Sequence, residues 1–341
     1  MGSLLHQLDE FPPELLRTQP QQLADVLGGP TLIHLPGRRE RPLFVSVLLH
    51  GNETTGFLAV QGLMQKYRER ELPRALSLFI GNVEAARDGL RRLAGQPDYN
   101  RVWPGGECPD SPERRMMAQI LEIMEPRRPF ASVDVHNNTG INPHYACINT
   151  IDHRFMHLGS LFSRTLVYFV RPVGVQSMAF ARLCPAVTVE CGKVGQSAGV
   201  QHVQEFLDAC LHLSDIPDHP VAAHDIDLFH TVAMLKVPRA LSFGFGDPSV
   251  DVCFIDDLDH LNFRELPAGT RLATLNEVDR MPLEAWDEQG VDVAQRFFHV
   301  EGDCLCTSRE FMPSMFTLDE RVIRQDCLGY LMERYPLPER G

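Results

Sequence analysis

Positive charge is scarce in this chain of 341 residues, which has 32 lysines and arginines against 45 aspartates and glutamates. The formal net charge is therefore −13. A phosphate backbone is bound by clustered positive charge, so this deficit argues against a nucleic acid as partner. With 44% hydrophobic and 23% charged residues, the composition is that of a globular protein and not of a disordered chain.

Long hydrophobic runs are also missing. The longest, at residues 43–50, has only the length of a strand, whereas a membrane-spanning helix needs about 18 or more apolar residues. Residues 1–16 carry acids and lack the basic region and apolar stretch of a secretory signal. We therefore predict a soluble, cytoplasmic protein with no membrane partner.

The cysteines do not indicate a disulfide framework. Their number, nine, is odd, and a chain of this length can form a sizeable core without cross-links. Cys304 and Cys306 form the only close pair, and one intervening residue is poor spacing for a structural zinc site. The pattern favours free thiols in a reducing compartment.

Short apolar runs alternate with segments of helical periodicity over the first two thirds of the chain, which predicts an α/β fold. Strands are predicted at residues 43–49, 76–80, 130–135, 145–149, 165–170 and 186–189, and helices at 57–70, 83–93, 114–125 and 200–213. Residues 94–112 form a long loop rich in glycine and proline. Loops of that length in a compact domain are usually functional.

The composition changes at residues 215–227, which are rich in proline, histidine and aspartate. We place a domain boundary there and predict two domains, residues 1–222 and 223–341. The downstream segments are short, β-rich and separated by turn residues. A smaller β-rich C-terminal domain is therefore expected.

Polar residues follow the predicted strand at 43–49. Ligands bind at the carboxyl ends of strands in α/β sheets, so His50 and Glu53 are candidates for a site. They are three residues apart across a glycine-containing turn, and they can direct an imidazole and a carboxylate at one zinc ion. A simple helix cap is the alternative, because an H-x-x-E pattern taken alone is weak evidence for a metal.

The predicted strand at 130–135 also ends in polar residues and places His136 at the same edge. Asp134 lies two residues earlier on the same strand face, where it can orient a histidine ring. Two histidines and one carboxylate, His50, Glu53 and His136, leave a fourth position for water, which is typical of catalytic zinc. The alternative for His136 is a loop histidine with satisfied hydrogen bonds.

Glu190 follows the predicted strand at 186–189. It is either a salt-bridged strand end or a catalytic base that takes a proton from a zinc-bound water and passes it to a leaving amine. Cys191 would point to the opposite strand face and is expected in the core.

The long loop contains Asn100 and Arg101 between tryptophan, proline and glycine residues. An arginine placed beside a zinc site in so acidic a protein indicates an anionic partner, and its guanidinium matches a carboxylate. Arg87 and Arg91, in contrast, are interpreted as part of a solvated helix face.

These ordered motifs resemble those of the succinylglutamate desuccinylase/aspartoacylase family of zinc carboxypeptidase-like hydrolases. The likeness covers about residues 40–215, and it is carried by HGNE with His50 and Glu53, DYNRVWPG with Asn100 and Arg101, DVHNNTG with His136, and VECG with Glu190. The resemblance implies a mixed sheet flanked by helices. It also implies one Zn²⁺ per chain, with His50, Glu53 and His136 as its ligands.

The same resemblance gives roles to the other residues. Glu190 would be the general base and acid, and Asn100 and Arg101 would hold a substrate carboxylate. Arg92 is the nearest match to an arginine that polarises the scissile carbonyl. Arg91 remains the alternative, because the stretch before Asn100 is one residue longer than in the family pattern.

The predicted function is that of a zinc-dependent hydrolase cleaving the amide bond of a small anionic N-acylated amino acid. One alternative is a carboxypeptidase-like or amidase activity on short peptides. Another is a zinc- or metabolite-binding protein without catalysis, which the presence of Glu190 argues against. The sequence does not name the acyl group or the amino acid, and a homo-oligomer is compatible with it.

Overall fold

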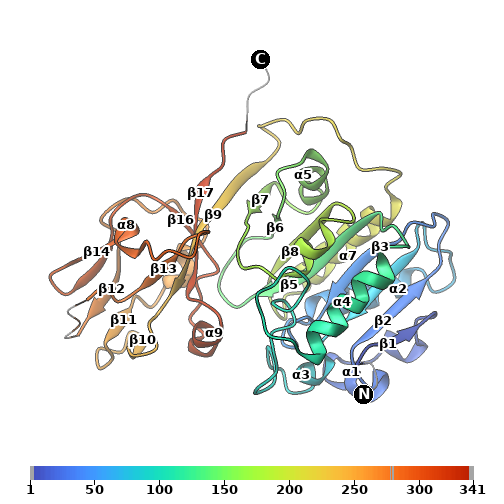
Figure 1. Cartoon of the computed structure of the whole chain (residues 1–341), viewed down its shortest axis with the longest axis horizontal. Coiled ribbons are helices and arrows are strands. Elements are labelled where there is room, and N and C mark those ends of the chain that lie inside the picture. Colours follow the sequence, from blue (N-terminus) through green and yellow to red (C-terminus); the bar gives the residue numbers. More distant parts are fainter. Residues whose placement is uncertain (1–3, 277, 279, 338–341) are drawn as a thin grey trace. The chain divides into compact units, whose positions relative to one another are not determined.

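The computed structural model describes residues 4–276, 278 and 280–337, and its internal contacts divide them into two units (Figure 1). Unit 1 contains residues 4–137 and His144–Asp227. Unit 2 contains Asn138–Pro143 and Leu228–Leu337. A short segment in the middle of the chain is therefore part of the C-terminal unit.

A mixed sheet forms the centre of unit 1, as the sequence predicts. Its strand order is β1-β2-β4-β3-β5-β8-β6-β7. β3 runs parallel to both β4 and β5, whereas β2 is antiparallel to β4, and β6 to β8. The strands are β1 (His6–Leu8), β2 (Thr31–Leu35), β3 (Leu43–Val47), β4 (Leu76–Ile80), β5 (Ala131–Asn138), β6 (Tyr145–Ile148), β7 (Thr165–Tyr168) and β8 (Ala186–Lys193).

Helices pack on both faces of this sheet. They are α1 (Leu23–Leu27), α2 (Thr55–Lys66), α3 (Val83–Arg87), α4 (Pro112–Met124), α5 (His153–Ser160), α6 (Gln176–Phe180) and α7 (Ser197–His212), with 3-10 turns η1 (Pro13–Leu16) and η2 (Pro20–Gln22). A Cβ at Gly56 of α2 would lie 3.0 Å from Val47 and Val135, so α2 packs on the face of those residues. Phe180 of α6 stacks on Phe44 at 4.1 Å between ring centroids. Because side chains alternate along a strand, Phe44 and Val47 lie on opposite faces.

The structure corrects one predicted helix. The helix expected at 83–93 ends at Arg87, because Gly89 adopts a left-handed conformation, with φ at 63°. The amide of Leu90 then donates to the main-chain oxygen of Ala85, which closes the helix end. Residues 88–98 are therefore turns and loop. Arg91 and Arg92 lie in this loop and not on a helix.

Unit 2 is rich in strands, as predicted for the C-terminal part of the chain. β9 pairs with β13 and β17, β17 pairs with β16, and a further sheet has the order β10-β11-β12-β15-β14. The elements are β9 (Asp227–Lys236), β10 (Phe243–Phe245), β11 (Val252–Phe254), η3 (Leu258–Leu261), β12 (Arg271–Leu275), β13 (Glu284–Trp286), α8 (Ala294–Phe297), β14 (Phe298–Glu301), β15 (Cys304–Thr307), β16 (Met312–Ser314), α9 (Glu320–Gln325) and β17 (Gly329–Arg334). Phe254, Phe297 and Phe311 are buried in its core.

Unit 2 holds the segment Asn138–Pro143 through Asn262 and Phe316. The amide nitrogen Nδ2 of Asn262 donates to the main-chain oxygens of Ile141 (3.1 Å) and Phe316 (2.8 Å). A Cβ at Gly140 would lie 1.8 Å from the main-chain oxygen of Phe316, so only glycine fits there. The chain leaving β5 is thus fixed inside unit 2.

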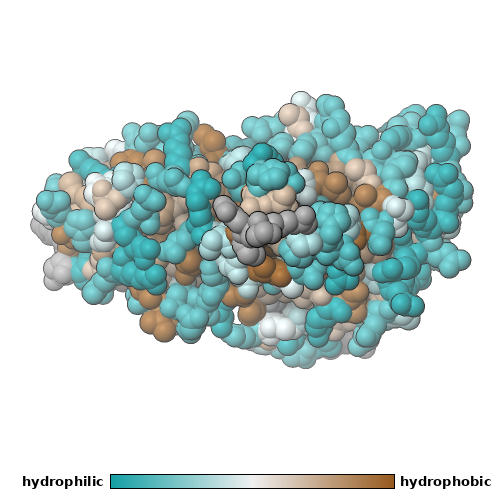
Figure 2. Space-filling view, turned by 90° about the horizontal axis from the view of Figure 1, so that it is seen from above, coloured by the Kyte–Doolittle hydropathy of each residue, from teal (hydrophilic) through white to brown (hydrophobic). Residues whose placement is uncertain are grey.

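Hydrophilic side chains cover most of the face seen in Figure 2, and hydrophobic ones form small separate patches. Along the described part of the chain, no helix combines the length and the apolar character that a bilayer span requires. All nine cysteines carry free thiols, as predicted.

Candidate metal centre and active site

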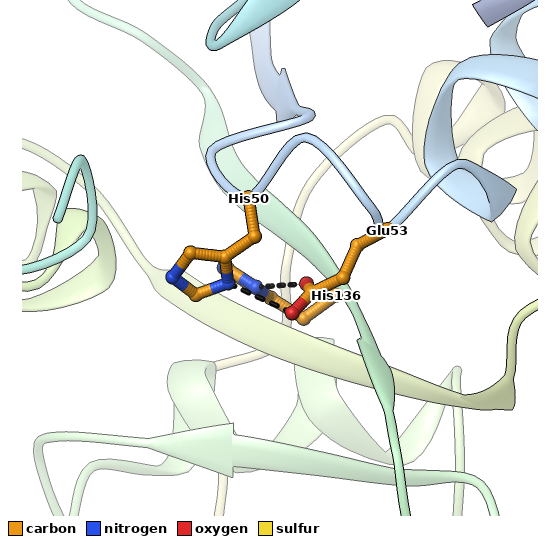
Figure 3. A group of neighbouring side chains, drawn as sticks. All are labelled: His50, Glu53 and His136. Atoms are coloured by element: carbon orange, nitrogen blue, oxygen red, sulfur yellow. Dashed lines mark hydrogen bonds and ion pairs between the residues drawn. The ribbon is translucent and has the colours of Figure 1, made fainter. Parts of the chain in front are cut away.

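The carboxyl ends of β3 and β5 bring together the residues singled out in the sequence (Figure 3). His50 and Glu53 lie between β3 and α2, and His136 lies near the end of β5. All three are buried, and each offers a ligand atom within 4.8 Å of the other two. Among the described residues, no other group of histidine, cysteine, aspartate and glutamate meets this criterion.

The turn between His50 and Glu53 depends on Gly51. A Cβ at position 51 would lie 2.3 Å from the main-chain nitrogen of Ala86 in α3, so a larger residue cannot be accommodated without a shift. The amide of Gly51 donates to the main-chain oxygen of Arg91 (3.1 Å), and the amide of Glu53 donates to that of His50 (3.1 Å). The turn is therefore fixed by its own backbone and by α3.

The carboxylate of Glu53 lies between the two imidazoles. Its Oε1 is 2.8 Å from Nδ1 of His50, and its Oε2 is 2.7 Å from Nδ1 of His136. Both histidines therefore direct the same ring nitrogen, Nδ1, toward one point. Two nitrogens and a carboxylate oxygen converge there.

Carboxylates hold the outer nitrogens of both rings. Nε2 of His50 is 2.9 Å from Oδ1 of Asp98, and Nε2 of His136 is 2.8 Å from Oδ2 of Asp134. Ser46 in turn donates to the other oxygen of Asp134 (2.6 Å). A carboxylate on Nε2 favours the proton on that nitrogen, which leaves the lone pair of Nδ1 for a metal.

Arg91 is the arginine that reaches this cluster. Its Nε and Nη2 donate to Oδ2 of Asp98 at 3.2 and 3.0 Å, and its Nη1 lies 3.7 Å from Oε1 of Glu53. Arg92, the first choice from the sequence, instead donates from Nη1 to the main-chain oxygen of Gln96 (2.6 Å). The end of α3 at Arg87 and the turns that follow orient the two arginines differently.

Asn100 and Arg101 also lie at this edge. Nδ2 of Asn100 donates to Oδ2 of Asp134 (3.3 Å), and Oδ1 of Asn100 accepts from the amide of Gln176 (2.9 Å). Arg101 donates from Nη1 to the main-chain oxygen of Asn100 (2.9 Å). The buried side chain of Asn100 thus orients Asp134, and the half-buried Arg101 lies beside it.

Glu190 lies on β8, and its side chain is buried. Thr188, two residues earlier on the same strand face, donates to Oγ of Ser177 in α6 (3.0 Å), so Glu190 faces the side of the sheet that α6 covers. The pKa of Glu190 is raised to about 7, chiefly by burial; His136 acts against this rise, and Glu53 contributes to it. A carboxyl group with a pKa near 7 can both accept and donate a proton at neutral pH.

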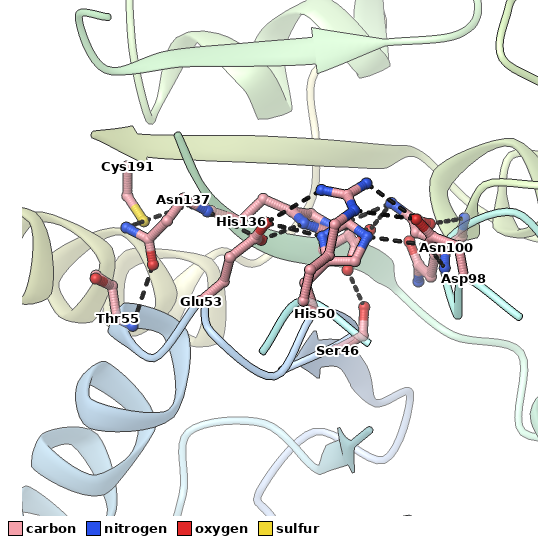
Figure 4. A network of polar contacts seen from close by, with 12 residues as sticks. Ser46, His50, Glu53, Thr55, Asp98, Asn100, His136, Asn137 and Cys191 are labelled. Carbon is pink, nitrogen blue, oxygen red and sulfur yellow. Dashed lines mark hydrogen bonds and ion pairs between the residues drawn. The ribbon is translucent and has the colours of Figure 1, made fainter. Parts of the chain in front are cut away.

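Asn137 connects the strands around the cluster (Figure 4). Its amide donates to Oε2 of Glu53 (3.2 Å), its Oδ1 accepts from the amide of Thr55 (3.2 Å), and its Nδ2 donates to the main-chain oxygen of Gly192 (2.8 Å). The thiol of Cys191 donates to the main-chain oxygen of His136 (2.7 Å). Cys191 is therefore a buried hydrogen-bonding partner on the face opposite Glu190.

The charges in the cluster shift the pKa values in opposite directions. Burial alone would raise the pKa of Glu53, but His50 and His136 outweigh it and hold that pKa far below its usual range. Burial and Arg91 act to lower the pKa of His50, whereas Glu53 and Asp98 raise it above its ordinary value. Burial likewise acts to lower the pKa of His136, but Asp134 and Glu53 raise it well above its ordinary value. The imidazoles therefore hold protons that a metal ion would displace.

The donor set fits zinc. Imidazole nitrogen and carboxylate oxygen are ligands that zinc accepts, and three protein ligands leave a fourth position open, as in catalytic sites. Asp98 and Asp134 supply the hydrogen bonds that ligating histidines commonly make on the outer nitrogen. Asp98 has no role predicted from the sequence, although it precedes Asn100 by two residues in the DYNR motif.

Comparison with known proteins identifies the family of the chain. A model of the succinylglutamate desuccinylase/aspartoacylase catalytic domain matches residues 41–216. The chain belongs to this family. Its members are hydrolases that deacylate amino acids, and the match covers the region from β3 to α7 that contains the whole cluster.

Individual relatives of the family are distant in sequence. A succinylglutamate desuccinylase from Shewanella woodyi is 25% identical over 264 residues, which cover 69% of this chain and 73% of that protein. The crystal structure of the Chromobacterium violaceum succinylglutamate desuccinylase aligns with a TM-score of 0.58 at 18% identity, over 88% of this chain and 87% of that one. Murine aminoacylase 3 aligns with a TM-score of 0.54 at 15% identity, over 87% and 96%. These likenesses establish the shared fold.

Proposed function

We propose that the protein is a zinc-dependent hydrolase that cleaves the amide bond of a small anionic N-acylated amino acid. The observation that carries the proposal is the convergence of His50, Glu53 and His136 at one strand edge, with Glu190 buried on the neighbouring part of the sheet. Membership in a family of deacylating hydrolases supports it.

Nδ1 of His50, Nδ1 of His136 and the carboxylate of Glu53 would hold one Zn²⁺ ion. When bound, zinc supplies Lewis acidity, which polarises a carbonyl group and lowers the pKa of water. Asp98 and Asp134 keep the two rings in the required tautomer and orientation. These five residues therefore form one preorganised unit.

Glu190 is the proposed proton carrier. Its carboxylate accepts a proton from water as the oxygen of that water attacks the amide carbon. The protonated Glu190 then delivers the proton to the amide nitrogen as the carbon–nitrogen bond breaks, which releases a carboxylic acid and an amine. A pKa of about 7 allows both transfers at neutral pH.

We assign the arginines on the basis of their positions. Arg91 lies against Glu53 and Asp98, so we propose that Arg91 and not Arg92 stabilises the charge that develops on the amide oxygen. Arg101 is proposed to bind the substrate carboxylate, with Asn100 holding Asp134 and supporting that loop. The nine free thiols are in keeping with the cytoplasm as the place of action.

The test couples metal content to turnover. The purified protein is analysed for zinc and assayed for amine release from N-acetyl and N-succinyl amino acids, with and without a chelator. About one zinc per chain and chelator-sensitive release are expected. The Glu190→Ala variant should retain zinc and lose turnover, and Glu122→Ala, on the exposed face of α4, serves as the control.

The alternatives give different results in the same assay. Zinc binding with release only from short peptides would favour a peptidase or amidase. Unaltered turnover in Glu190→Ala would remove this residue from the mechanism. A protein that neither contains nor takes up zinc would contradict the proposal as a whole.

A further inference from the structure

A hollow in unit 1 lies at the ends of the strands that are opposite to the candidate metal centre. Its volume is about 510 Å³, and it is lined by residues around the end of β2 and the starts of β3 and β4, among them His34, Pro42 and Ser77. The metal-binding residues follow the other ends of β3 and β5. A five-residue strand spans about 16 Å, so the two places are separated by the length of β3.

His34 in the wall of this hollow has an incomplete set of hydrogen bonds. The residue is 8% exposed, and its Nδ1 lies 2.9 Å from the hydroxyl oxygen of Ser77 on the paired strand. Its Nε2 is buried and has no hydrogen-bonding partner among the described residues. Buried polar atoms in folded proteins are nearly always paired, so such an atom in a hollow indicates a ligand that completes the pairing.

The ring of His34 is a neutral hydrogen-bonding group. Its pKa is lowered to about 4, chiefly by burial; the charge of Arg127 contributes to the lowering, and Asp9 acts in the opposite direction. A neutral imidazole offers one donor and one acceptor. Arg127 and Asp9 line the same hollow as this ring.

Charges of both signs line the hollow. Asp9, Glu40 and Arg127 are exposed, and none of the three forms an ion pair with another described residue. A guanidinium matches a carboxylate, and the two acids attract a cation. Between them, Leu35, Pro36 and Leu76 provide apolar surface. This combination is complementary to a molecule that carries an ammonium group, a carboxylate and an apolar side chain.

We propose that this hollow is a second binding site, which takes a zwitterion of the size of a free amino acid or a dipeptide. Arg127 binds the carboxylate, Asp9 and Glu40 attract the ammonium group, and Nε2 of His34 pairs with a polar atom of the ligand. The site does not require a metal. It is separate from the reaction proposed above, and either assignment can fail without the other.

The experiment is calorimetric titration of the full-length, metal-depleted protein with free leucine, free phenylalanine and leucyl-leucine. N-acetylleucine, which lacks the ammonium group, and leucinamide, which lacks the carboxylate, are the matched ligands. We expect saturable binding of at least one zwitterion. Removal of either charge from that ligand should weaken binding tenfold or more.

Variants locate the binding on the protein. Arg127→Ala and Asp9→Asn should each weaken binding at least tenfold, whereas Arg128→Ala, at the exposed neighbouring position outside the hollow, should leave it unchanged. The ring nitrogen signals of His34 can be assigned by NMR because they are absent from the spectrum of His34→Gln. In the parent protein these signals should shift when the zwitterion is added. If His34→Gln fails to fold, the variants at the exposed Arg127 and Asp9 still test whether the ligand binds in this hollow.

Two results would overturn the proposal. One is the absence of saturable binding with all three zwitterions. The other is binding that Arg127→Ala and Asp9→Asn leave intact, since the ligand would then occupy a different place. Because the titration is done without metal, neither result depends on whether the protein hydrolyses an amide.

Discussion

Replacing Glu190 with glutamine should make the metal-free protein more stable at alkaline pH while abolishing its activity. Glu190 is buried on β8, and burial raises its pKa from 4.5 to about 7. The folded protein therefore binds this proton more tightly than the unfolded chain does. The stabilising contribution of the protonated carboxyl is complete below pH 4.5 and is lost as the pH rises through 7.

The size of the effect follows from the two pKa values. A difference between 4.5 and about 7 corresponds to roughly 3.5 kcal/mol, at about 1.4 kcal/mol for each pH unit. Glutamine has nearly the same shape and no charge, so Glu190→Gln does not lose stability in this way. Part of this contribution is already lost at pH 5, so relative to the parent protein the variant should gain about 2.5 kcal/mol of unfolding free energy between pH 5 and pH 8.

The assay is urea unfolding of both proteins in chelator at pH 5 and pH 8, compared as a double difference. The double difference cancels the pH dependence of groups that both proteins share, apart from those that interact with Glu190, such as His136. A gain in stability combined with lost turnover is typical of a residue retained for catalysis. A variant that is less stable than the parent at pH 8 would refute the reasoning, because Glu190 would then be a stabilising partner.

Further predictions concern the surroundings of the cluster. Asp98→Asn should weaken zinc binding about 10–100-fold in competition with a chromogenic chelator, because Nε2 of His50 loses its carboxylate; unchanged affinity would contradict this role. Arg91→Ala should lower kcat/KM about 100-fold or more, whereas Arg92→Ala should have a small effect; equal losses would argue against the assignment of Arg91. Gly51→Ala should lower the free energy of unfolding by about 1–3 kcal/mol, because the new Cβ meets the backbone of α3. The control is Gly29→Ala, whose Cβ would have ordinary contacts at 3.6 Å or more, and equal stability of the two variants would show that the turn can shift.

The convergence of His50, Glu53 and His136 was predictable because it depends on topology. His50 follows the buried strand β3 and His136 lies near the carboxyl end of β5, and the carboxyl ends of neighbouring parallel strands meet at one sheet edge. The pairing of Asp134 with the ring of His136 follows from their separation by two residues on one strand. These inferences need only the strand period and the direction of the chain.

The arginine assignment was not predictable in the same way. The sequence predicts a helix as far as residue 93, but α3 ends at Arg87, and the orientations of Arg91 and Arg92 depend on where it ends. Gly89 marks that end, since its left-handed conformation closes the helix, and an aspartate–glycine pair is a recognised turn signal. The choice of Arg91 still required the position of Asp98, a contact that no spacing rule gives.

The segment Asn138–Pro143 shows where sequence reasoning ends. Its contacts within unit 2 join residues far apart in the chain, such as the amide of Met315 and Oδ1 of Asn142 at 3.0 Å. A local pattern cannot reveal a partner 173 positions away. That Gly140 must be glycine is likewise visible only once Phe316 is in place.

Glu53 and Glu190 show how one residue type can serve two purposes at one sheet edge. Burial acts to raise the pKa of both. Glu53 lies within 2.8 Å of the two imidazoles, which overcome burial and keep it ionised, as a metal ligand must be. Glu190 has weaker compensation from His136 and is opposed by Glu53, so its pKa stays near 7. The same two histidines therefore favour the ionised form of Glu53, which suits its proposed role as a ligand, and leave the pKa of Glu190 near 7, which suits its proposed role as a proton carrier.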